Sequence, residues 1–98
     1  MALKTTPFDV ADYLDAPEDI EAYLAEAFAS NDPTLISVAL GDVSRAKGMA
    51  RVANETGLSR ESLYKSLSET GNPELATILK IMRSLGLSLA PKAISEAV

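Results

Sequence analysis

Apolar residues recur every three or four positions along much of the chain, which is the spacing of one face of an α-helix. Three stretches show this stripe clearly, at residues 17–29, 33–46 and 73–85. Their stripe residues are Ile20, Tyr23, Leu24, Ala27 and Phe28; Leu35, Ile36, Ala39, Leu40 and Val43; and Leu75, Ile78, Leu79, Met82 and Leu85. We therefore predict three amphipathic helices that bury these side chains in a common core.

Capping residues indicate where the three helices begin. Proline fits the first turn of a helix, so Pro17, Pro33 and Pro73 predict the three starts. Asp32 and Asn72 each precede one of these prolines, and both residue types can accept a hydrogen bond from the free N–H groups of a first turn. Both are therefore predicted N-caps.

The segments outside the stripes are less regular. Residues 9–14 fit either one helical turn or a short extended piece. Gly86 is expected to end the last helix in a left-handed conformation, and the alternation of residues 87–89 predicts a short strand after it. Pro91 interrupts that strand, so residues 92–98 are expected to form a frayed helical turn or to be disordered.

The sequence MARVANETGLSRESLYKSLS, which starts at residue 49, predicts two short helices joined by a tight turn. Gly57 ends the first helix, because glycine adopts left-handed backbone without a Cβ penalty. Ser59 is a predicted N-cap for a second helix over residues 60–68. The small Ala53, then Gly57 and Leu63, have the spacing of a helix-turn-helix, whose second helix lies in the DNA major groove. A purely structural helical hairpin is the alternative.

Charge is distributed unevenly along the chain. The net charge is −5, and residues 1–32 hold eight acidic residues and one basic residue, a net −7. Residues 33–48 and 49–98 each carry +1. This asymmetry favours two faces with two different partners.

Composition limits the possible functions further. The chain has 98 residues and is 47% hydrophobic, which suits one domain that is marginally stable alone. Neither histidine nor cysteine is present, so no common general base or thiolate is available and we do not expect an enzyme. Asp15, Glu18 and Asp19 lack a calcium-loop pattern, so no metal or cofactor is expected. With no membrane-length apolar run and no signal peptide, the sequence predicts a cytoplasmic protein.

Polar side chains on the outer side of the predicted helix 60–68 have groups that can contact base edges. Arg60 or Lys65 can donate to guanine O6 and N7, and Glu61 can accept from cytosine N4. Tyr64 can contact a methyl group or a phosphate. These four residues are the candidate base-reading set.

A second group of polar residues is suited to the DNA backbone. Ser59 and Asn72 lie at predicted helix N-termini, where N–H groups favour phosphate. Arg45, Lys47 and Arg51 are candidate phosphate clamps.

The candidate DNA-contacting cations are few, so one protomer would neutralise few phosphates. We therefore expect a symmetric homodimer on two half-sites about 34 Å apart. Leu87, Leu89 and Ile94 are the apolar residues left for a dimer surface, and packing on their own core is the alternative.

A helix before the turn motif and an apolar helix after it resemble the small all-α bundle of Cro and phage-repressor-type DNA-binding domains. Nearly the whole chain also resembles the probable addiction-module antidote proteins, which are HigA-like helix-turn-helix antitoxins of bacterial type II toxin–antitoxin pairs. The segments that carry this resemblance are PFDVADYL, PEDIEAYLAEAF, ALGDVSRAKGM, TGLSRESLYKSLSETGNPEL and LKIMRSLGLSL. In the wider repressor pattern the position of Ser66 is often apolar, and here Leu67 follows it instead.

The resemblance implies an antitoxin that neutralises a RelE/ParE-like toxin of the HigB type by direct binding and represses its own operon on double-stranded operator DNA. It divides the chain into an acidic helical extension at residues 1–32, a helix-turn-helix domain at residues 33–90 and a tail at residues 91–98. The alternatives are a stand-alone helix-turn-helix regulator and an interaction module without DNA binding.

The acidic extension is the expected toxin-binding part, because toxins of this kind tend to be basic. Charge would speed association, and Tyr13, Tyr23 and Phe28 are candidate apolar anchors. The competing interpretation is that the stripe of residues 17–29 is simply the first wall of the core.

Overall fold

The computed structural model describes residues 9–94, and this part of the chain is helical and contains no strand. The elements, in order, are the 3-10 helix η2 (Val10–Tyr13) and the α-helices α1 (Pro17–Ala29), α2 (Pro33–Lys47), α3 (Met49–Thr56), α4 (Arg60–Ser66) and α5 (Leu75–Ser84). None of the helices in this range is long and apolar enough to cross a membrane. The all-α prediction is confirmed, and the segment at residues 9–14 is a helical turn.

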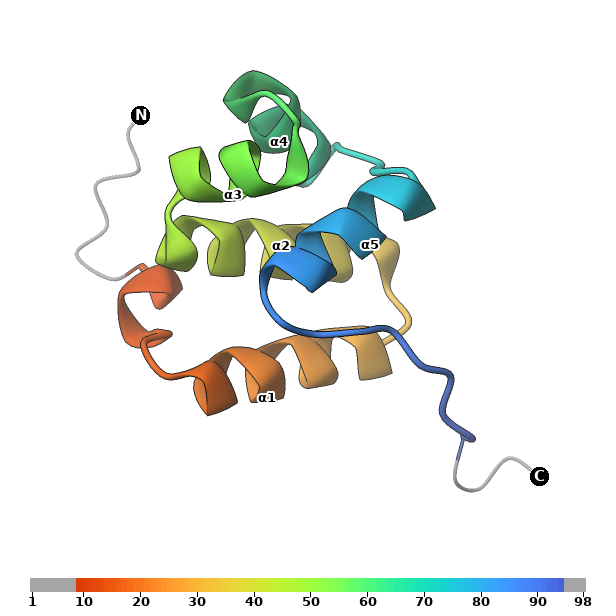
Figure 1. Ribbon diagram of the computed structural model, residues 1–98. Helices are drawn as coiled ribbons and strands as arrows, with labels where there is room; N and C mark the ends of the chain where they lie inside the picture. Colours follow the sequence, from red (N-terminus) through yellow and green to blue (C-terminus); the bar gives the residue numbers. More distant parts are fainter. Residues whose placement is uncertain (1–8, 95–98) are drawn as a thin grey trace.

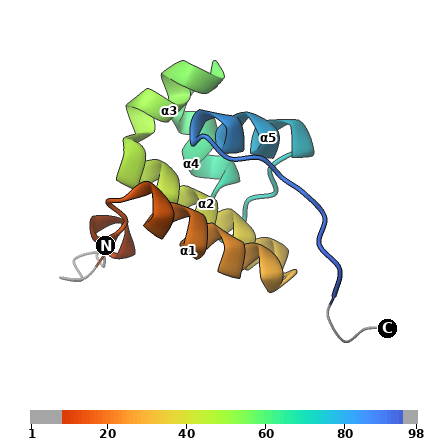
Figure 2. The same ribbon diagram turned by 60° about the horizontal axis from the view of Figure 1, so that its bottom comes forward.

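Helix α2 lies at the centre of the molecule. Figure 1 shows α1 running antiparallel below it, α3 and α4 above it, and α5 in front of it, and Figure 2 shows the same arrangement from another side. The side chains that α2 contributes to the core include Leu40 and Val43, both 0% exposed. Val52 of α3, Leu63 of α4 and Ile81 of α5 are equally buried, so four helices meet in one core.

Two of the predicted helix starts are confirmed. Pro17 begins α1, and Asp32 caps α2, its Oδ1 accepting from the backbone N–H of Thr34 at 3.0 Å and of Leu35 at 3.4 Å. Asn31, just before that cap, has a φ of 56°, a left-handed conformation that asparagine tolerates. The hairpin between α1 and α2 is therefore encoded within a few residues.

The predicted end of α4 and the predicted start of α5 are wrong. Helix α4 ends at Ser66 rather than residue 68, and α5 begins at Leu75 rather than residue 73. Glu74 is the N-cap of α5 and makes no side-chain capping bond, so Asn72 is not the N-cap. A Cβ on Gly71 would lie 2.2 Å from the carbonyl oxygen of Ser66, so this glycine permits a tight turn after α4. The chain then reaches α5 through non-helical residues.

The predicted burial of three leucines and the predicted strand at residues 87–89 are also wrong. Leu35, Leu75 and Leu79 are 47%, 63% and 45% exposed. Leu35 and Leu75 lie in the first turns of α2 and α5, where the helices extend beyond the core. Residues 87–89 are non-helical and form no strand with any other part of residues 9–94.

Candidate functional site

The turn between α3 and α4 is built by local hydrogen bonds. Gly57 has a φ of 77°, in the left-handed region, as predicted. The hydroxyl of Thr56 donates to the carbonyl of Val52 at 2.8 Å and accepts from the N–H of Leu58 at 3.3 Å. Ser59 caps α4, since its hydroxyl accepts from the N–H of Ser62 at 3.0 Å. The turn therefore fixes where α4 starts and which side of it faces outward.

The outer side of α4 carries polar side chains that have no partner within the part of the chain that the structure describes. Arg60, Glu61 and Lys65 are exposed, and Tyr64 is 48% exposed. The opposite side of α4 is held by Leu63, which is fully buried. The structure thus brings the four candidate base-reading residues together on one exposed face.

Two of the candidate phosphate clamps share one carboxylate. The Lys47 ammonium lies 3.3 Å from Oε1 of Glu55, and Arg51 Nε lies 3.3 Å from Oε2. Lys47 also donates to the backbone carbonyl of Ser84 at the end of α5. These hydrogen bonds, first from Lys47 and then from Arg51, lower the pKa of the Glu55 carboxyl. Glu55 therefore offsets one of the two positive charges, and both cations have a partner within the protein.

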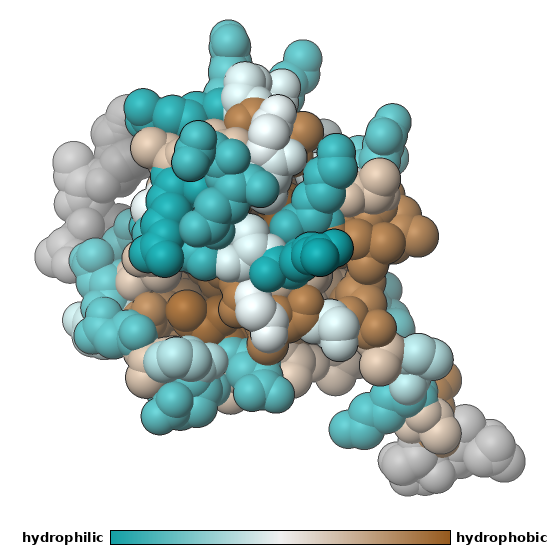
Figure 3. Space-filling view, in the orientation of Figure 1, coloured by the Kyte–Doolittle hydropathy of each residue, from teal (hydrophilic) through white to brown (hydrophobic). Residues whose placement is uncertain are grey.

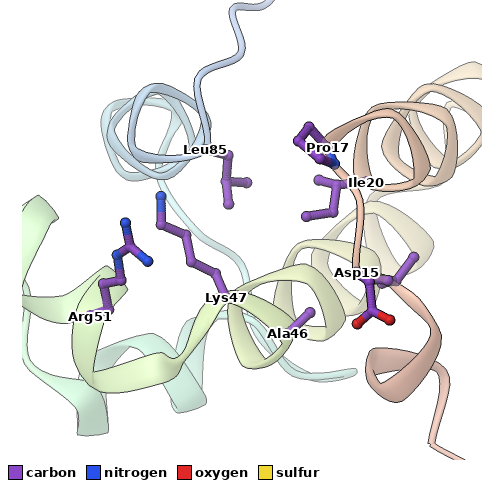
Figure 4. Close-up of a pocket in the computed structure, with 8 residues that line it drawn as sticks. Asp15, Pro17, Ile20, Ala46, Lys47, Arg51 and Leu85 are labelled. Carbon is purple, nitrogen blue, oxygen red and sulfur yellow. The ribbon is translucent and has the colours of Figure 1, made fainter.

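A cleft of about 330 Å³ opens beside this group, between the start of α1 and the ends of α2 and α5. Figure 4 shows Lys47 extending from α2 toward the end of α5, next to Arg51 and across from Pro17 and Ile20. The remaining lining residues are Leu14, Asp15, Ala46 and Leu85. The cleft holds the Lys47 side chain and no cluster of acids.

The third candidate clamp, Arg45, belongs to a polar network that ties the N-terminal segment to α2. Its Nη2 lies 2.9 Å from Asp9 and 2.9 Å from Asp42. Burial opposes the charge of Arg45, but the hydrogen bonds to these two carboxylates outweigh it and raise the guanidinium pKa. The N–H of Ala11, followed by Arg45, lowers the pKa of Asp9. Arg45 therefore holds two segments together.

Tyr23 of α1 joins the same network. Its hydroxyl donates to Asp42 at 2.5 Å, and Asp42 itself is only 8% exposed. Burial, followed by the hydrogen bond to Asp42, raises the pKa of Tyr23 to about 12. This hydroxyl is thus committed to a contact within the chain.

The outer face of α1 is acidic. Glu18, Asp19, Glu21 and Glu26 are all exposed, and none forms an ion pair within residues 9–94. In the same range, no three acidic residues are placed to hold a metal ion. The face therefore presents unpaired negative charge to solvent.

The predicted toxin anchors lie in different environments. Tyr13 is 62% exposed at the end of η2, whereas Tyr23 and Phe28 are partly buried and pack against the core. Of the predicted dimer residues, Leu87 and Leu89 pack partly against their own core, and Ile94 is 70% exposed. Their roles as contact residues stay predictions.

Sequence reasoning missed Asp42 and Glu55. Asp42 and Glu55 lie four or fewer residues from Arg45 and Arg51, and that helical spacing was the available signal. A Cβ on Gly41 would lie 2.7 Å from the carbonyl oxygen of Leu67, so α2 and the end of α4 approach closely there. No local pattern identifies Leu67 as that neighbour.

The sequence is similar to a known protein family and to a protein of Haemophilus influenzae. A family model described as "Probable addiction module antidote protein" matches residues 4–93. An uncharacterized protein of Haemophilus influenzae is 49% identical over 80 residues, which is 82% of each chain. No solved structure matches the chain.

Proposed function

The chain belongs to the family of probable addiction module antidote proteins, and from this membership we propose that it is an antitoxin that binds its cognate toxin directly and represses transcription at operator DNA. The family match over residues 4–93 is the observation that carries the antitoxin role. For the toxin we propose a basic RelE/ParE-like protein of the HigB type. The proposed role is binding rather than catalysis, in the cytoplasm, by a homodimer.

The exposed face of α4 supports the DNA half of the proposal. Arg60 and Lys65 are the two basic residues of α4, and they are unpaired among residues 9–94, whereas Arg45, Lys47 and Arg51 are all held by carboxylates. A guanidinium or ammonium on a major-groove helix can read guanine. The unpaired cations of α4 are therefore available for base contact. The three paired cations are less available for phosphate contact.

The DNA half is tested with DNA from upstream of the protein's own gene, by fluorescence anisotropy at fixed salt. Arg60→Ala and Lys65→Ala should each weaken binding by about 1–3 kcal/mol. Lys80→Ala is the matched control, because Lys80 is an exposed cation on α5 without an ion pair in the described chain. Wild-type affinity in both folded α4 variants would overturn the assignment.

The acidic face of α1 supports the toxin half of the proposal. Its exposed carboxylates are free of ion pairs in the described residues, so they are available to a basic surface. The same charge would be repelled by DNA. The two proposed partners therefore fit opposite sides of α2, where α1 and α4 lie (Figure 1).

The toxin half is tested by charge reversal. Glu21→Lys combined with Glu26→Lys should slow association with the cognate toxin about tenfold or more at low salt. Glu69→Lys combined with Glu74→Lys changes the net charge equally, at exposed positions outside α1, and should have little effect. Equal association rates for both double variants, measured by stopped-flow, would exclude α1 as the toxin-binding face.

One observation favours a second candidate, an interaction module without DNA binding. Three of the basic residues nearest the turn motif are already paired, so little uncompensated positive charge remains. No binding to upstream DNA, together with toxin neutralisation in co-expressing cells, would favour that candidate. Specific DNA binding with no toxin affinity would instead indicate a stand-alone regulator.

A further inference from the structure

An apolar groove of about 260 Å³ lies on the side of the molecule where α5 begins. Figure 3 shows apolar side chains gathered at the right of the molecule, over the start of α5. None of the groove's lining residues is charged; they are Phe28, Asn31, Pro33, Ile36, Ser37, Asn72, Pro73, Leu75, Ile78 and Leu89. Leu75, one of these lining residues, is 63% exposed, so its side chain is accessible to a partner.

The charge of this groove distinguishes it from the two faces assigned above. DNA needs cations and a basic toxin needs carboxylates, and the groove lining has neither. An uncharged concave surface with the exposed Leu75 fits an apolar side chain of its partner. The partner must therefore carry an exposed apolar element of its own.

The segment at residues 90–94, which is apolar apart from the exposed Lys92, is such an element. Residues 90–94 are all exposed, and Ile94 is 70% exposed. Residues 88–94 form no hydrogen bond with the rest of the described chain. Figures 1 and 2 both show this segment leaving the body of the molecule after passing α1. Its apolar side chain thus has no place in its own protomer.

The geometry of the segment disfavours a return to its own groove. Leu89 lines the groove, but Pro91 follows two residues later and restricts Ala90 to an extended backbone. The chain therefore continues outward rather than turning back. A groove and an unplaced apolar segment on one protomer make a self-complementary pair in a two-fold dimer.

We propose that this groove is a homodimer interface, in which the segment at residues 90–94 of each protomer crosses to its partner and Ile94 packs beside the partner's Leu75. The inference deepens the proposed function, since an operator of two half-sites needs a two-fold dimer. Of the predicted dimer residues it uses Leu89 and Ile94, and the role of Leu87 stays a prediction.

The test is sedimentation equilibrium of the full chain over a wide range of micromolar concentrations. The wild type should sediment as a dimer, and Leu75→Glu and Ile94→Glu should each weaken dimerisation about tenfold or more, because each places a charge in an apolar contact. Both side chains are exposed in one protomer, so thermal unfolding of the dissociated protein should be unchanged. Leu75→Ser provides a milder variant with the same expected direction.

Ala50→Glu is the matched control, because it adds the same charge at an exposed position of α3, and α3 does not line the groove. The double variant Leu75→Ala with Ile94→Ala should weaken dimerisation less than the two single alanine effects combined, since the two residues meet across the interface. Additive effects, or an unaffected Ile94→Glu, would overturn the crossing segment. A lower melting temperature of monomeric Ile94→Glu would overturn it in favour of the protomer's own groove.

A monomeric wild type at every concentration would overturn the whole inference. If that monomer still binds toxin or upstream DNA, the proposed function stands without it. If the protein forms a dimer that depends on Leu75 and Ile94 but binds neither toxin nor upstream DNA, the interface stands and the proposed function fails. Failure of the interface and failure of the proposed function are therefore distinguishable.

Discussion

Helices α1 and α4 both pack on α2, but they are attached to it by different kinds of contact. Helix α1 is held in part by polar groups, through the Tyr23 hydroxyl on Asp42, which also binds Arg45. The end of α4 is held by a close backbone approach, where Gly41 faces the carbonyl of Leu67. The hydrogen bonds that hold α1 depend on the protonation of their groups, and each can be removed by a single substitution. The close approach at α4 depends instead on the absence of a methyl group at Gly41.

This difference matches the tasks proposed for the two helices. A helix that reads base edges needs a fixed position, because hydrogen bonds in the major groove are lost when donors move. An acidic face that attracts a basic partner acts over longer distances and tolerates small shifts. The close backbone approach therefore lies beneath the helix for which the more demanding contact is proposed.

The largest expected effect comes from filling the close approach. Gly41→Ala should lower the free energy of unfolding by about 3 kcal/mol, because the new Cβ would meet the Leu67 carbonyl oxygen. Helix propensity alone predicts the opposite sign, a gain of about 1 kcal/mol. Urea denaturation measures the difference.

Gly57→Ala is the control for this substitution. Gly57 has nothing within 4 Å of an added Cβ, so only its positive φ opposes alanine there. Its cost should be about 1 kcal/mol, from left-handed backbone strain. If Gly41→Ala is stabilising, then α2 and α4 separate without cost and the contrast with α1 is lost.

Removing the polar link should have an intermediate effect. Tyr23→Phe should lower the free energy of unfolding by about 1.5 kcal/mol, because Asp42 is buried and loses a donor. Operator affinity should be unchanged, since α4 is attached elsewhere. Tyr64→Phe removes a hydroxyl that has no partner among the described residues and should change stability little.

The smallest expected effect is the pH dependence of that link. The pKa of Tyr23 is raised to about 12 in the folded state from an ordinary 10, so the folded state holds this proton more tightly. The stability that Tyr23 adds should be fully present below pH 10 and should be lost as pH rises through about 12. The comparison is wild type against Tyr23→Phe in denaturant titrations at increasing pH. A difference between the two proteins that stays constant as pH rises past 12 would show that the folded state does not hold the Tyr23 proton more tightly.

The sequence predicted those parts of the fold that neighbouring residues determine. Asp32 and Pro33 define the start of α2, and Gly57 and Ser59 define the turn before α4, because each acts on N–H groups or dihedral angles a few residues away. The predicted start of α5 was wrong because Asn72 is a residue type that favours the N-cap position but does not cap this helix.

Contacts between distant residues could not be predicted in this way. The apolar stripe placed Leu75 in the core because periodicity gives a face and not its length, and α5 begins beyond the core. The same limit applies to Lys47, which was expected at a phosphate but bonds to the end of α5 and to Glu55. These positions depend on where separate helices meet.

The carboxylate that Glu55 shares between Lys47 and Arg51 has a thermodynamic consequence for any DNA complex. A cation that is already paired within the protein displaces few condensed counterions from a phosphate, and counterion release sets how steeply affinity falls with salt. If Arg60 and Lys65 of α4 each also neutralise one phosphate, they would contribute about −2 per protomer to the slope of log affinity against log salt concentration. Such a repressor would hold its operator through changes in cellular osmolarity that release more highly charged binders.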